Sequence, residues 1–154
     1  MFQIHSIEEI LSPFKTPSAL SSYARGKLSR VPGDVIGILD AMQRLAGHKL
    51  AEEMIFVNDE GKGLYHDYPD LAPLAVGIAV NGQGESWLMD VKSGKIAIFD
   101  HGSGDTYPLE MDFWQFLRLA DLIGQYERAE NTDGIYEAMA QIDIELLENY
   151  PFEL

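Results

Sequence analysis

Residues 74–100 read LAVGIAVNGQGESWLMDVKSGKIAIFD, in which two turn sequences separate three short apolar runs. The runs cover residues 74–80, 86–91 and 96–100, and their composition is typical of strands. The connecting residues 81–84 and 92–95 are rich in Asn, Gly and Ser, which favour turns. Gly94 can supply the positive φ of a tight hairpin. This stretch therefore predicts an antiparallel meander.

The first run, residues 74–80, has two unlike faces. Larger side chains alternate with Ala75, Gly77 and Ala79. Because alternate residues of a strand point to opposite faces, the small residues share one face. We expect another element to pack close to the backbone there.

Helical periodicity flanks the meander on both sides. Ser6, Asp34 and Asp112 each precede an apolar repeat and suit the N-cap position. They predict helices at residues 6–11, from Asp34 to a cap at Gly47, and at 112–123. A further helix is predicted at residues 132–148. Residues 15–31 suit a short helix or a loop, and residues 58–73 a polar loop.

Residues 50–60 are ambiguous. Leu50, Met54 and Val57 lie on one helical face, whereas the composition of residues 54–57 suits a strand. Whichever holds, helices that precede and follow a meander indicate an α+β fold. We expect one domain over residues 1–154. Its central, mostly antiparallel sheet lies at about residues 74–100, between helices from the N-terminal and C-terminal segments.

The chain is acidic, with a formal net charge of −14 over 154 residues. Residues 1–50 hold four acids and six bases, whereas residues 110–154 hold eleven acids and two bases. Such a charge repels nucleic acid and anionic membranes and attracts basic proteins. The chain has no cysteine, no long apolar segment and no signal-peptide pattern. We therefore expect a cytoplasmic protein with a basic protein partner, which binds neither nucleic acid nor membrane.

The glycine-rich turn does not resemble a phosphate-binding loop. Gly82 and Gly84 provide G-x-G, but Trp87 stands at the third glycine position and a strand follows. Residues 100–105 contain Asp, His and Ser, yet neighbours along one loop rarely form a catalytic triad. Acids also accompany His66 and His101, without the spacing of a zinc site. We predict no cofactor, no metal and no catalytic residue, and we interpret His5 and His48 as surface residues without partners.

The two tryptophans each suit a core or an interface. Trp114 flanks the apolar stripe of its helix, which favours the core or its edge. Trp87 alternates with Met89 and Val91, which favours the core. An exposed Trp87 would instead be a strong anchor for a partner.

Several motifs, taken in order, resemble the SUKH superfamily of fungal cell-wall assembly regulators and bacterial toxin-immunity proteins. Val31-Pro32-Gly33-Asp34, with the helix to Gly47, looks like the family's Leu-Pro-x-Asp-Tyr helix. Residues 74–91 and 96–101 are similar to its strand, glycine turn and following strands. Residues 111–117 look like the opening of its closing helix. The resemblance spans about residues 30–125, and residues 130–150 would add an acidic C-terminal helix.

The resemblance implies an α+β fold, helical residues 50–60 and no catalysis. It also implies an immunity protein that binds and neutralises a polymorphic toxin, often a nuclease. Two alternatives remain: an intracellular scaffold or regulator, and a small-ligand or metal-binding hydrolase in the loops around residues 66 and 101. For a partner surface the sequence suggests residues at strand ends and loops. These are Glu85, Trp87, Asp90, Asp100, His101 and Asp105, with the acidic C-terminal helix as the competing site.

Overall fold

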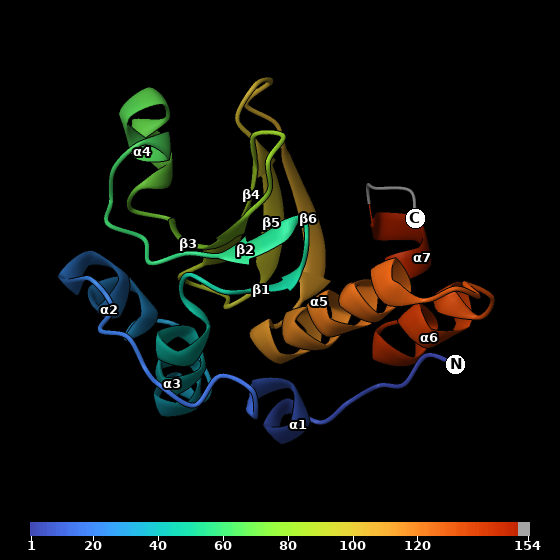
Figure 1. Ribbon diagram of the computed structural model, residues 1–154. Helices are drawn as coiled ribbons and strands as arrows, with labels where there is room; N and C mark the ends of the chain where they lie inside the picture. Colours follow the sequence, from blue (N-terminus) through green and yellow to red (C-terminus); the bar gives the residue numbers. More distant parts are fainter. Residues whose placement is uncertain (151–154) are drawn as a thin grey trace.

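The computed structural model describes residues 1–150, in which six strands form one sheet of order β1–β6 (Figure 1). All neighbouring strands are antiparallel, which confirms the predicted α+β class. The strands are β1 (Lys49–Ala51), β2 (Met54–Phe56), β3 (Ala75–Val80), β4 (Glu85–Asp90), β5 (Ile96–Asp100) and β6 (Thr106–Met111).

The helices begin where capping residues were predicted. Ser6, Asp34 and Asp112 each accept a hydrogen bond from a backbone N–H in the first turn. The helical segments are α1 (Ile7–Leu11), α2 (Ser22–Leu28), α3 (Val35–Leu45), α4 (Leu64–Asp67), η1 (Pro69–Leu71), α5 (Phe113–Arg128), α6 (Ile135–Ile142) and α7 (Leu146–Asn149). Residues 15–31 thus contain a helix, and the predicted polar loop at 58–73 contains two short helical turns.

The central meander is confirmed, including its turns. Asn81 Oδ1 accepts the backbone N–H groups of Gln83 and Glu85 at 2.9 and 3.0 Å, which fixes the β3–β4 turn. Gly84 and Gly94 have φ values of 91° and 75°, in the left-handed region that glycine tolerates best. The glycines of this stretch therefore turn the chain between strands.

Residues 50–60 do not form the helix that the SUKH resemblance implies. They contain β1 and β2, and β2 pairs with β3 through Ile55–Val80 and Phe56–Ala79. The hairpin buries Ala51, Met54 and Phe56 in the core. Pairing with β3, some 25 residues further along the chain, decides the structure of a segment whose local pattern was ambiguous.

In the C-terminal third the sheet extends beyond the predicted residues 74–100, and the predicted last helix is divided. Residues 106–111 form the edge strand β6, where Pro108 is tolerated and Glu110 has a φ of 57° beside an irregular register. The helix predicted at residues 132–148 is two helices, α6 and α7, because Asp143 is extended between them. The apolar residues Ile135, Met139 and Leu146 of this segment are nevertheless buried.

The sheet separates two clusters of apolar side chains. The larger cluster joins one face of the sheet to α2, α3, α5 and α6. The Trp87 side chain, which is 1% exposed, packs there against Phe116. Trp114 is partly buried at its edge, so both tryptophans follow the core interpretation. On the other face Ala75, Leu88 and Phe99 meet side chains from α4 and η1, and Figure 1 shows α4 well apart from α5.

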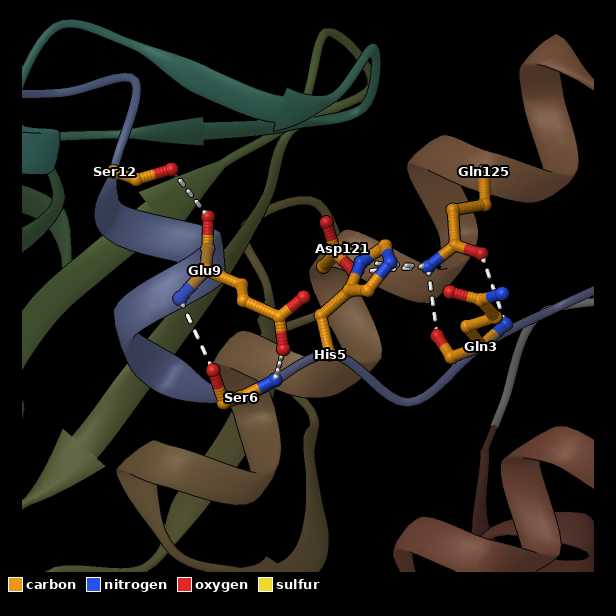
Figure 2. A network of polar contacts seen from close by, with 7 residues as sticks. All are labelled: Gln3, His5, Ser6, Glu9, Ser12, Asp121 and Gln125. Carbon is orange, nitrogen blue, oxygen red and sulfur yellow. Dashed lines mark hydrogen bonds and ion pairs between the residues drawn. The ribbon is translucent and has the colours of Figure 1, made fainter.

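The N-terminal segment is fastened to α5 by polar contacts (Figure 2). His5 Nδ1 lies 2.8 Å from Asp121 Oδ2, and Gln125 Nε2 donates to the same oxygen at 2.9 Å. Gln125 also bonds the backbone of Gln3. The prediction that His5 has no partner is therefore wrong, and His48 stacks against Phe14 with ring centroids 5.1 Å apart.

Among residues 1–150, no helix combines the length and apolarity that crossing a bilayer requires.

Candidate functional site

Three of the predicted partner-binding residues gather at one end of the sheet. Glu85 and Asp100 lie directly opposite each other at the ends of β4 and β5. Asp105 follows the β5–β6 turn, where its carbonyl oxygen accepts the Asp100 N–H at 2.9 Å. The turn stands at the top of the view in Figure 1. The structure thus brings these three acids together from two strands and one turn.

Asp90 does not belong to this group. It lies at the opposite end of β4, where its carboxylate accepts bonds from Ser93 Oγ at 2.7 Å and from the backbone N–H of Ser93 at 3.2 Å. Asp90 therefore stabilises the β4–β5 turn. Trp87 is also removed from the candidate surface, because its side chain is buried in the core.

His101 connects the β5–β6 turn to the segment that crosses the second face of the sheet. Its Nε2 lies 2.8 Å from Asp67 Oδ2 at the end of α4. Tyr68 donates its hydroxyl to the His101 carbonyl oxygen at 2.6 Å, and the two rings meet edge to face. The loops around residues 66 and 101, which the sequence suggested separately, are therefore in contact.

Asp59 anchors the other end of this segment, which we call the strap (residues 58–72). Its Oδ2 accepts the Tyr65 hydroxyl at 2.6 Å and the Gly77 N–H at 2.7 Å. A Cβ atom at residue 77 would lie 3.3 Å from that oxygen, so the missing side chain of Gly77 admits the carboxylate. The prediction that Ala75, Gly77 and Ala79 share one face is wrong, because the register shifts after Gly77 and Ala79 lies in the larger cluster. Asp59 was not predicted as a site residue, although the small Gly77 indicates that another element approaches the backbone of β3.

The strap contacts the N-terminal helices as well. Tyr23 Oη and Lys27 Nζ both donate to the carbonyl oxygen of Ala72. Burial is the main cause that raises the pKa of Tyr23 and Tyr65 and lowers that of Lys27. These shifts favour the neutral forms of groups that hold the strap in place.

The strap and the strand ends together form what we call the acidic rim: Asp67, Glu85, Asp100 and Asp105. Within residues 1–150, His101 is the only ion-pair partner of these acids, since the Lys and Arg ion pairs lie elsewhere. One oxygen of Glu85 is buried with no hydrogen bond from the described residues. Acidic residues gathered at one end of a sheet without a Lys or Arg ion pair attract a cationic surface.

The described residues of the rim do not form a Ser–His–Asp triad. Ser103 Oγ accepts the Asp105 N–H at 3.2 Å, and no hydroxyl of the described residues bonds the His101 ring. Among residues 1–150, no group of three or more His, Asp or Glu side chains is arranged to hold a metal ion.

Compared with protein-family models, curated proteins and solved structures, the chain has no significant match. The SUKH resemblance therefore stays a prediction.

Proposed function

We propose that this chain is a non-enzymatic protein-binding domain whose partner is a basic protein docked at the acidic rim. One observation carries the proposal: four acidic residues from two strand ends, a turn and the strap lie at one end of the sheet, and a single histidine is their ion-pair partner. His101 holds the Asp67 carboxylate and the Gly102 N–H holds that of Asp100, so these two side chains lose little conformational freedom on binding.

Within this class we propose an immunity protein that neutralises a toxin, as the SUKH resemblance implies. A nuclease toxin suits the rim, because an enzyme that grips phosphate is basic where it acts. An acidic protein that covers such a surface would exclude the nucleic acid. A scaffold or regulator would use the same rim for a housekeeping partner.

The test is co-expression of the chain with the product of the neighbouring gene, with survival of the cells as the readout. We expect protection from the unchanged chain and its loss in the Glu85→Lys/Asp105→Lys variant. Each substitution replaces an attractive charge with a repulsive one at the rim. The control is Glu130→Lys/Asp133→Lys, the same change in net charge at two exposed residues in the loop before α6.

Failure of every neighbouring gene product to be neutralised would contradict the immunity role. Affinity capture of a housekeeping protein, lost in the same double variant, would then support the scaffold role. Protection lost in a Glu137→Lys/Glu148→Lys variant instead would move the binding surface to α6 and α7.

A further inference from the structure

A hollow of about 390 Å³ opens where the β1–β2 turn, the β3–β4 turn and the C-terminal half of α5 meet. Three aromatic side chains line it, those of Trp87, Tyr126 and Tyr150, together with Met54 and Ile123. Its volume falls within the range of ligand sites, roughly 300–1,000 Å³. We call it the aromatic hollow.

Two carboxylates also line the aromatic hollow, and both lie at the β1–β2 turn. Glu53 Oε2 accepts the Gly82 N–H at 3.1 Å, and Glu127 Oε1 accepts the Glu52 N–H at 3.0 Å. Their other oxygens form no hydrogen bond within residues 1–150, and neither carboxylate pairs with a Lys or Arg there. Because both carboxylates line the same hollow without a Lys or Arg partner, a cation bound there is attracted by each of them.

The phenol of Tyr150 responds to the negative charge of Glu127 in the aromatic hollow. Burial, and then the negative charge of Glu127, raise the pKa of its phenol above the ordinary value. Glu127 therefore acts electrostatically on an aromatic wall of the hollow. A cation seated beside both groups would gain from the carboxylate and from the aromatic side chains that line the hollow.

We infer that the aromatic hollow binds the guanidinium group of an arginine side chain presented by the protein partner. Arginine is favoured because its planar head stacks on aromatic rings and bonds carboxylates through several donors at once. Its aliphatic stem suits the contact with Met54 and Ile123. This inference rests on the proposed function, because it names a second contact for the same basic partner.

The aromatic hollow and the acidic rim both adjoin the β3–β4 turn. Asn81 and Gln83 of the β3–β4 turn line the hollow, and Glu85 begins the rim two residues later. The Gly84 carbonyl oxygen accepts the His101 N–H at 3.0 Å, which joins this turn to the rim. One partner can therefore contact both places at once, and the hollow supplies an anchor within a field of negative charge.

The test is a titration of the full, isotope-labelled chain with Nα-acetyl-arginine amide, followed by backbone and indole NMR shifts. The control ligand is Nα-acetyl-citrulline amide, which has the same shape without the charge. We expect saturable shifts centred on Ala51, Met54 and the Trp87 indole with arginine and none with citrulline. Glu53→Gln and Glu127→Gln keep the oxygen that accepts the backbone N–H, and each should weaken binding about two- to fivefold.

The control variant Glu137→Gln, on the exposed face of α6, should bind as the unchanged chain does. Equal shifts with citrulline, shifts centred on residues 100–105 or on α6, or insensitivity to both glutamine variants would overturn the inference. None of these results touches the proposed function, which is decided by the rim variants in cells. If the rim variants lose protection and arginine causes no shifts, the proposed function is supported and the arginine site is refuted.

Discussion

Gly124 lies in the middle of α5, where the carbonyl oxygen of Leu50 in β1 approaches the helix. A Cβ atom at residue 124 would collide with that oxygen, which belongs to the backbone and cannot rotate away. The absence of a side chain thus permits α5 to cover the edge strand β1. A covered edge cannot pair with another chain, which is how sheets avoid aggregation.

We predict that Gly124→Ala lowers the free energy of unfolding by about 1–3 kcal/mol, the usual cost of overpacking. The matched control is Gly26→Ala in α2, where a Cβ atom meets nothing within 4 Å. Because alanine is the better helix former, the control should gain about 0.5–1 kcal/mol. Urea unfolding measures both, and equal effects at the two glycines would refute the role assigned to Leu50.

The strap is the element on which the candidate surface depends. It contributes Asp67 to the acidic rim. Asp59 bonds the Gly77 N–H near the start of the strap, and His101 contacts Asp67 further along it. Within the strap, the Tyr65 side chain is buried and donates its hydroxyl to Asp59. Loss of the Tyr65 proton would place two negative charges side by side in a buried site, which the fold resists.

This arrangement predicts a loss of stability at alkaline pH. Burial, followed by the Asp59 carboxylate, raises the pKa of Tyr65 above its ordinary value of about 10. Above that pH the unfolded chain releases the proton while the folded chain keeps it, so the free energy of unfolding falls as the pH rises. Tyr65→Phe should reduce this decline and cost about 1–3 kcal/mol at neutral pH through the lost hydrogen bond.

Urea unfolding at about pH 8 and about pH 11 separates the two effects. Tyr107→Phe, at a tyrosine that is 40% exposed, is the control and should leave the decline as it was. A decline just as steep in Tyr65→Phe as in the unchanged chain would argue against this account of Tyr65.

Elements held by local signals were predictable from the sequence, and elements held by distant pairing were not. The three central strands alternate and have turn residues at both connections, and Asp112 announces α5 through its cap. In contrast, β1 and β2 have three residues each and depend on β3, while β6 contains Pro108 and an irregular register. Three residues are too few for a periodic pattern, and in β6 the proline and the register shift interrupt the strand signal.

The candidate site divides in the same way. Glu85, Asp100 and Asp105 surround one hairpin, so their neighbourhood follows from the predicted meander. Asp67 meets His101 across 34 residues of chain, and Glu127 meets the β1–β2 turn across 75. No spacing rule connects residues so far apart, because their contact exists only after the strap and α5 have packed.

Charge is unevenly distributed over the whole molecule. Residues 1–50, which form α1 to α3, hold six bases and four acids, whereas the rest of the chain holds five bases and twenty-one acids. Figure 1 shows α2 and α3 on the side of the molecule opposite to α6 and α7. A basic partner is therefore drawn toward the sheet and C-terminal side before any contact forms.

For this reason we predict that association with the partner is fast in dilute salt and slows as salt is added. Ions screen charges that lie further apart than about 10 Å at roughly 0.1 M salt. Reversing Glu85 and Asp105 should slow association and flatten its dependence on salt, since fewer charges then steer the encounter. Stopped-flow mixing over a series of salt concentrations measures both quantities, with Glu130→Lys/Asp133→Lys as the control for the same change in net charge. Association rates that match the unchanged chain in dilute salt would show that the rim does not guide the partner, and would leave the acids of α6 and α7 as the surface to reverse next.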